Sequence, residues 1–270
     1  MIVKLRGGLA PLIILTVLIF SLLPAQEEDI WDVYYNILKA KKDDIPPEYG
    51  DIIMKNKIES MKKAGVQPVV FPHWFHRIRF KCKVCHEDIF IMKKGANDIN
   101  MKKIMEGEYC GKCHNGVIAW EPIYCDRCHR YDSKKAQREQ YEALKVLPRD
   151  RLGFIDWAKA AKEGLLKPKG KLYPHEQEAI PEEPFDLDVV IVAKADFMKD
   201  VVFPHWIHTF WLGCANCHPK IFIPSAGANP ISMIEIWQGK WCGRCHGKVA
   251  FPTFDCTRCH VKPKEKKGKK

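Results

Sequence analysis

The stretch VVFPHWFHRIRFKCKVCH, residues 69–86, decides how this chain folds, and it recurs as VVFPHWIHTFWLGCANCH at residues 201–218. Each copy places an H-x-x-H pair six residues ahead of a C-x-x-C-H box. Further matches follow each copy at the same separation, such as Gly95-Ala96-Asn97 and Gly227-Ala228-Asn229. Self-similarity over such a distance indicates one structural unit that is used twice.

Boxes of this kind account for every cysteine. The chain has 12 cysteines, and each stands in a C-x-x-C pair that a histidine follows directly. This is the attachment pattern of c-type haem, in which both thiols bind one porphyrin and the histidine ligates its iron. The sequence therefore predicts six covalently bound haem c groups. They would be attached to Cys82, Cys85, Cys110, Cys113, Cys125, Cys128, Cys214, Cys217, Cys242, Cys245, Cys256 and Cys259, with His86, His114, His129, His218, His246 and His260 on the irons.

Two other uses of C-x-x-C fit this pattern poorly. A structural zinc site combines two such pairs and needs no histidine directly after each of them. A redox dithiol uses one reactive pair in a folded scaffold, whereas this chain has six.

A count of axial ligands singles out four more histidines. The chain has 11 histidines, of which the boxes use six. The repeated pairs His73/His76 and His205/His208 are the predicted distal ligands of four haems. His175 has no counterpart in the other repeat, so we interpret it as a structural residue.

The third haem of each repeat then has no distal histidine. Of the eight methionines, only Met101 and Met233 occupy equivalent positions, and a thioether ligand raises the reduction potential of a haem. We expect these two residues to be the missing ligands. The alternative is that they fill gaps against porphyrin, which leaves those haems five-coordinate or ligated from elsewhere.

The chain divides into six segments. Residues 1–25 have the pattern of an export signal, with Lys4 and Arg6 ahead of an apolar run that is short for a membrane span. The alternative is an uncleaved anchor. After it we expect a helical segment (26–66), a first trihaem domain (67–132), a partly helical connector (133–184), a second trihaem domain (185–262) and a basic tail (263–270).

Local patterns predict a few regular elements. Apolar spacing indicates helices over residues 29–40, 51–64, 140–147 and 153–166, and a strand at 69–71. Each box region is short for a chain that must hold three haems, and short chains bury little by themselves. We therefore expect the porphyrins to form the interior and the apoprotein not to fold.

Composition limits the class of protein further. The mean hydropathy of −0.28 excludes a polytopic membrane protein. The formal net charge is +11, and haem propionates would offset much of it. The remaining basic residues either dock an acidic redox partner or form a solvated face.

The motifs also resemble a known family. F-P-H-x-x-H followed by three C-x-x-C-H boxes resembles cytochrome c7, a class III (c3-like) trihaem family, and the C-G-x-C-H second box resembles the tandem repeats of "nanowire" cytochromes. The segments 147–151 and 155–157 are similar to the connector of that family. The resemblance implies that the first histidine of each pair serves the first box and the second histidine serves the second box.

One position departs from the family pattern. A third histidine normally precedes the second box, where this chain has Glu106 and Gln238. Some tandem members use methionine on that haem, which agrees with Met101 and Met233.

The resemblance implies a mostly irregular, haem-cored multihaem cytochrome c with short α-helices and two tandem trihaem domains. The predicted signal implies export to the periplasm or beyond, and four irons closed by two histidines each favour the transfer of single electrons over catalysis. Expected partners are a donor and an acceptor redox protein, with a membrane quinol-oxidising or reductase complex as one candidate, and further copies of itself; nucleic acid is not expected. The alternatives are a multihaem reductase with an open haem, and a haem-wire subunit of a filament or membrane complex.

Overall fold

The computed structural model describes residues 50–86, 88–131, 142, 144–173 and 183–265. All of them belong to one compact unit, Ala40–Lys270. The predicted signal, the predicted helix at 29–40, His175 and most of the basic tail lie outside the described residues. Within the described part, no helix has the length and apolar character that crossing a membrane requires.

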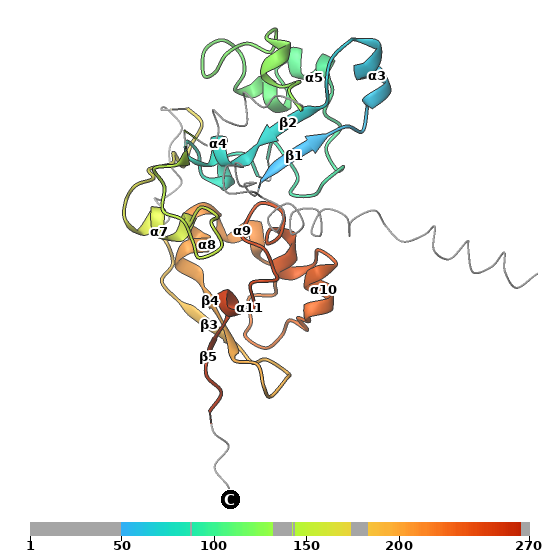
Figure 1. Ribbon diagram of the computed structural model, residues 1–270. Helices are drawn as coiled ribbons and strands as arrows, with labels where there is room; N and C mark the ends of the chain where they lie inside the picture. The colour runs from blue at the N-terminus through green and yellow to red at the C-terminus, as the bar shows by residue number, and fades with distance from the viewer. Residues whose placement is uncertain (1–49, 87, 132–141, 143, 174–182, 266–270) are drawn as a thin grey trace, which may run out of the picture. The chain divides into compact units, whose positions relative to one another are not determined.

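Short elements dominate the first repeat, residues 50–131 (Figure 1). They are β1 (Asp51–Met54), α3 (Ile58–Lys63), β2 (Val69–Pro72), α4 (His73–Arg77), the 3-10 helix η1 (Cys82–Val84), α5 (Met101–Met105), η2 (Tyr109–Lys112) and η3 (Cys125–Arg127).

The second repeat, residues 183–265, follows the same course from its histidine helix to its third box, but β4 follows β3 without a helix between them and β5 is added at the end. Its elements are β3 (Asp188–Ile191), β4 (Asp200–Pro204), α8 (His205–Trp211), α9 (Cys214–Cys217), α10 (Met233–Trp237), η4 (Trp241–Arg244), α11 (Cys256–Cys259) and β5 (His260–Lys262). The helix α7 (Trp157–Lys162) lies in the connector.

In both repeats a pair of antiparallel strands precedes the helix that carries the H-x-x-H histidines, which is α4 or α8. In the second repeat β5 also pairs with β4. β1 pairs antiparallel with β2 so that Asp51 faces Pro72, and β3 pairs with β4 so that Asp188 faces Pro204. Each proline ends its strand and caps the helix that follows, because proline fixes φ near the helical value and needs no partner for a backbone N–H. The expected strand at 69–71 is confirmed.

The predicted helix over 51–64 is wrong in its first half. Residues 51–54 form β1, and helix is limited to α3, which ends just before Gly65 at φ +68°. Ile52 and Ile53 lie opposite Phe71 and Val70. This is a non-local pairing that suits β-branched side chains and outweighs the local helical pattern.

The connector helix is also shorter than the pattern predicts. α7 begins at Trp157 because the Asp156 carboxylate accepts a hydrogen bond from the backbone N–H of Lys159, 3.0 Å away. Ahead of it, the Asp150 carboxylate accepts hydrogen bonds from the N–H groups of Leu152 and Phe154 and holds a turn. Aspartate favours such caps and turns over helix interiors.

A glycine permits close packing at the second box of each repeat. α5 packs against η2 and α10 against η4. A Cβ at Gly111 would overlap the carbonyl oxygen of Ile104, and one at Gly243 would overlap that of Ile236. The C-G-x-C-H form of these boxes therefore has a steric cause.

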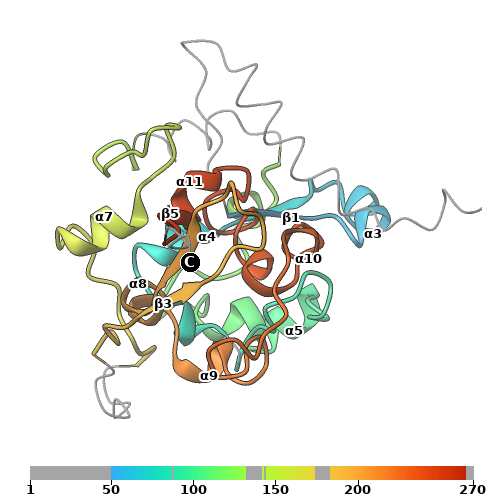
Figure 2. The same cartoon turned by 90° about the horizontal axis from the view of Figure 1, so that it is seen from below.

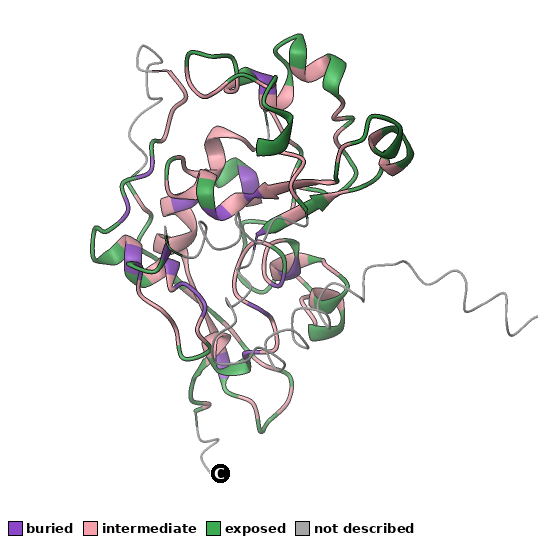
Figure 3. Ribbon diagram, turned by 45° about the horizontal axis from the view of Figure 1, so that its top comes forward, coloured by how far each residue is buried: buried purple, intermediate pink, exposed green. Residues whose placement is uncertain are grey.

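The polypeptide has little core of its own, since few of the described residues are buried (Figure 3). None of the buried hydrophobic residues among them belongs to a box. α7 lies beside α8 in two views (Figures 1 and 2). Trp157 packs edge-to-face on Trp211, with ring centroids 6.3 Å apart. Most of the described box residues are only half-buried or exposed. The buried cluster consists of Trp74, Leu144, Leu147, Ile155, Trp157, Ala160, Leu166 and Trp211, from α4, the connector and α8.

Candidate haem-binding sites

Ten histidines share one hydrogen-bonding pattern. In each of them Nδ1 lies 2.5–3.3 Å from a backbone carbonyl oxygen. A carbonyl can only accept, so Nδ1 carries the proton and the lone pair of Nε2 is left for a metal. This is the usual outer-shell contact of a metal-bound histidine. The ten are His73, His76, His86, His114, His129, His205, His208, His218, His246 and His260.

Three pairs of imidazole rings lie at a metal-bridging separation. The ring centroids are 6.3 Å apart in His73/His86, 6.4 Å in His76/His114 and 6.2 Å in His208/His246. Two imidazoles that bind one metal from opposite sides, at about 2.0–2.1 Å each, have centroids roughly 6 Å apart. The spacing therefore fits one iron between each pair.

The fourth predicted pair takes equivalent positions without the ring contact. Nδ1 of His205 donates to Leu187 and Nδ1 of His218 donates to Phe222, at 2.9 and 2.7 Å. Their counterparts His73 and His86 donate to Gly50 and Phe90, at 2.9 and 2.6 Å. The described residues show no ring contact between His205 and His218. The assignment of all four pairs stays a prediction.

Burial keeps several of these imidazoles neutral. Desolvation is the largest cause that lowers the pKa of His73 and of His246 to about 4. Burial also lowers the pKa of His76, His114 and His208. A neutral imidazole is the form that binds a metal.

The cysteines have the opposite character to redox dithiols. None of the twelve cysteines, all of which lie among the described residues, forms a disulfide. Burial raises the pKa of Cys85 to about 12 and that of Cys110, Cys245 and Cys259 to about 11. A disulfide oxidoreductase needs a lowered thiol pKa, so these four cysteines lack the character of a redox dithiol.

The histidine of the third box in each repeat pairs with the strand that precedes the H-x-x-H helix. Nδ1 of His129 donates to Gln67, and that of His260 donates to Lys199 at the equivalent position, at 2.5 and 2.6 Å. A cavity of about 440 Å³ lies beside His129, lined by Gly65, Val66, Gln67, Cys125, Asp126 and Arg130.

The two predicted methionine ligands lie apart from this cavity. Met101 and Met233 are the first residues of α5 and α10, with 48% and 36% of their surface exposed. Met101 is not on the wall of the cavity beside His129. The methionine ligands therefore also stay a prediction.

Sequence reasoning missed the polar contacts that join distant boxes and the connector. The buried Asn216, inside a box, accepts from Gly213 N–H at 2.7 Å and donates to the His86 carbonyl oxygen at 3.0 Å. Nothing at a variable box position signals such a partner, because it lies 130 residues away.

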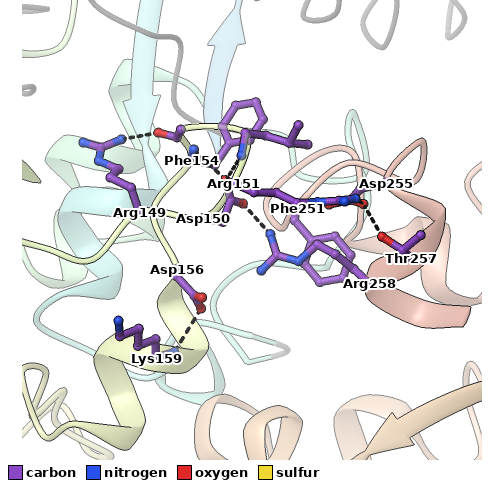
Figure 4. A network of polar contacts seen from close by, with 12 residues as sticks. Arg149, Asp150, Arg151, Phe154, Asp156, Lys159, Phe251, Asp255, Thr257 and Arg258 are labelled. Carbon is purple, nitrogen blue, oxygen red and sulfur yellow. Dashed lines mark hydrogen bonds and ion pairs between the residues drawn. The ribbon is translucent and has the colours of Figure 1, made fainter. Parts of the chain in front are cut away.

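A reciprocal pair of ion pairs joins the connector to the last box (Figure 4). Asp150 binds Arg258, and Arg151 binds Asp255. The Asp255 side chain is fully buried, and Arg258 lies 4.2 Å over the ring of Phe251. Segment 147–151, which resembles the connector of the family, therefore binds the last box of the second repeat through these two ion pairs.

Comparisons with known proteins agree with this picture. Residues 69–130 and 201–264 match the family described as cytochrome c7 and related cytochrome c. No curated protein matches the chain.

Solved structures of multihaem cytochromes are also similar to it. The C-terminal hexahaem fragment of GSU1996 is 27% identical, over 80% of this chain and 98% of that one. A c7-type three-haem cytochrome domain is 35% identical, over 31% of this chain and 94% of that one. The dodecahaem cytochrome c GSU1996 is 28% identical, over 82% and 51%. All three TM-scores are 0.26, so the superpositions carry no argument about arrangement.

Proposed function

The chain belongs to the cytochrome c7 family through two tandem trihaem segments, and from this premise we propose that it is an exported hexahaem electron carrier with four bis-histidine and two His/Met haems. Its cofactors are six c-type haems, and electron transfer is the activity of such cytochromes. Bound haem supplies one-electron chemistry, as iron alternates between the ferric and ferrous states.

One observation supports the proposed ligation above all: the three ring pairs whose spacing fits an iron between them. Two histidines that hold one haem between them would leave no place for a substrate to bind its iron. The backbone hydrogen bonds at Nδ1 hold each ring in place and raise its basicity. Closed, rigid sites favour a carrier over an enzyme.

Spectroscopy of the purified holoprotein tests this ligation. Electron paramagnetic resonance and near-infrared spectra should count four bis-histidine haems and two with a thioether-to-iron band. That band should vanish in the double variant Met101→Ala/Met233→Ala. Six bis-histidine signals, or a band that persists in the variant, would contradict the methionine assignment.

Intact mass tests two further parts of the proposal. It reports at once how many haems are attached and whether residues 1–25 have been removed. We expect six haems on a chain that begins at or near Gln26. A chain that retains its first 25 residues would favour a membrane-anchored protein.

The second candidate is a reductase with an open haem. The cavity beside His129, which Met101 does not line, is the observation that favours it. Rapid binding of carbon monoxide by the ferrous wild-type protein would support the reductase, whereas slow binding to a minor fraction would support the carrier.

Partners follow from the carrier proposal. A donor and an acceptor protein would dock at exposed haem edges, and a filament or membrane complex would use the same haems as a wire. Sedimentation of the holoprotein distinguishes a monomeric carrier from a self-associating wire.

A further inference from the structure

One arginine joins the first repeat, the connector and the second repeat. Arg77 is the last residue of α4. Its Cζ lies 4.4 Å from the ring centroids of both Trp157 and Trp211. Its Nη1 also donates to the carbonyl oxygen of Val249, at 3.4 Å. Two aromatic faces and a carbonyl therefore hold the guanidinium in a fixed position.

This position shields the charge from solvent. The indole faces attract the cation and replace much of the water around it. Trp211 is buried and Trp157 belongs to the same core cluster. A charge in such a place is screened less by salt and acts over a longer range than one on the surface.

The charge lies close to two of the predicted ligand pairs. Arg77 is one helical turn beyond His73, which faces His86. Val249 follows His246 by three residues, and His246 faces His208.

The second repeat has no such cation at the matching position. The residue equivalent to Arg77 is Thr209, whose hydroxyl donates to the His205 carbonyl at 2.8 Å and accepts from Phe185 N–H. The positive charge is therefore not part of the repeated unit. It belongs to the junction, by which we mean the place where Arg77 contacts the connector and the second repeat.

We propose that Arg77 is a built-in positive charge that raises the reduction potentials of the haems ligated by His73/His86 and by His208/His246. A haem held by either histidine pair would supply one-electron chemistry, with the electron coming from the donor protein and passing on to the acceptor. The electron neutralises one positive charge at the iron, so a nearby fixed cation favours the ferrous state. Arg77 would thus favour reduction of the two haems that lie near the contact between the repeats. The inference rests on the ligand pairs proposed above.

A redox titration that resolves the six haems by their NMR signals tests this role. In Arg77→Met we expect the two junction haems to shift to lower potential. The ferrous-to-ferric ratio at a fixed ambient potential should fall about tenfold, which for a one-electron couple is about 59 mV. Arg77→Lys keeps the charge and should retain most of the potential, even if it loses the stacking on the tryptophans.

Arg79→Gln is the matched control. It removes the same charge two residues away, from an exposed side chain that lies 3.7 Å over Phe75. Solvent screens that charge, so the junction haems should move much less. Equal shifts in Arg79→Gln and Arg77→Met would reduce the effect to net charge and overturn the proposal.

Two further outcomes are informative. If Arg77→Met only lowers the melting temperature and leaves all potentials unchanged, Arg77 is a structural residue and the inference fails while the carrier proposal stands. If the wild-type spectra lack bis-histidine haems, the proposed function fails first. Should Arg77→Met not fold, Arg77→Lys and Arg77→Gln give the same comparison.

Discussion

A histidine serves as an axial ligand only when its ring is oriented and its Nε2 is free. Here the backbone provides both, because a carbonyl oxygen accepts the Nδ1 proton of each box histidine and of each histidine in the H-x-x-H pairs. Side chains would provide the same bond less rigidly. The orientation of each predicted ligand is therefore set by the course of the chain itself.

The first prediction concerns one distal ligand. His76→Ala should convert one haem of six from low-spin to high-spin, because its iron keeps only His114. Resonance Raman spectra and carbon monoxide binding to the ferrous protein measure that fraction. His175→Ala, at the histidine without a counterpart, should leave both unchanged. A fully low-spin His76→Ala protein would disprove the pairing with His114.

The second prediction concerns the glycine of the second box. Gly243→Ala places a methyl group against the Ile236 carbonyl oxygen, so α10 or the box must shift. Overpacking of this kind typically costs about 1–3 kcal/mol. Denaturant unfolding of the holoprotein gives the change in free energy. The neighbouring exposed Arg244→Ala should cost much less, and a similar loss in both would refute the steric reason.

At the scale of elements, local sequence patterns predicted the structure correctly where neighbouring residues alone determine it. The strand at 69–71 follows from a few adjacent β-branched and aromatic residues. The strand β1 could not be predicted this way, because its partner is β2 and not a local pattern. Arg77, Asn216 and Asp255 likewise act on residues more than 70 positions away.

The third prediction concerns the ion pairs of the connector. Asp150→Asn keeps an oxygen for the turn at Leu152 and Phe154 but removes the charge that pairs with Arg258. The side chains of Asp150 and Arg258 are 6% and 21% exposed. Loss of one partner from a buried pair costs about 3–5 kcal/mol, and we expect the lower end because Arg258 is partly hydrated. Denaturant unfolding measures it.

Glu163→Gln is the control for this element. Its pair with Lys159, on α7, is 3.8 Å long and about half exposed on both sides. Exposed i,i+4 pairs contribute roughly 0.3–0.5 kcal/mol. If both variants lose the same small amount, the connector is not fastened to the last box by Asp150.

At the scale of the whole molecule, the repeat and its six boxes were readable from the sequence because covalent attachment fixes the spacing of the cysteines. The location of the polypeptide core was not. The connector was expected to be a partly helical link, and its Leu144, Leu147, Ile155, Trp157, Ala160 and Leu166 form most of the buried cluster. The apolar spacing of these segments predicts helices, but it does not reveal that their side chains converge with those of α4 and α8.

The last prediction concerns removal of the haems. Only one small cluster of buried side chains exists in the described residues, and it lies at the connector. A chain of 270 residues needs far more buried apolar surface than this to offset its conformational entropy. Apoprotein made without haem attachment should therefore show no cooperative thermal transition and little protection in hydrogen exchange, whereas the holoprotein should show both.

Loss of a single haem tests the same idea locally, because only the structure around that haem should lose its protection from hydrogen exchange. In Cys125→Ala/Cys128→Ala the third box of the first repeat cannot attach its haem, so only the interior around His129 is lost. Exchange protection should fall at η3 and at β2, which His129 bridges through Val69, and persist in the second repeat and at α7. A cooperative melt of the fully haem-free chain, or undiminished protection around His129, would mean that side chains alone can form this interior.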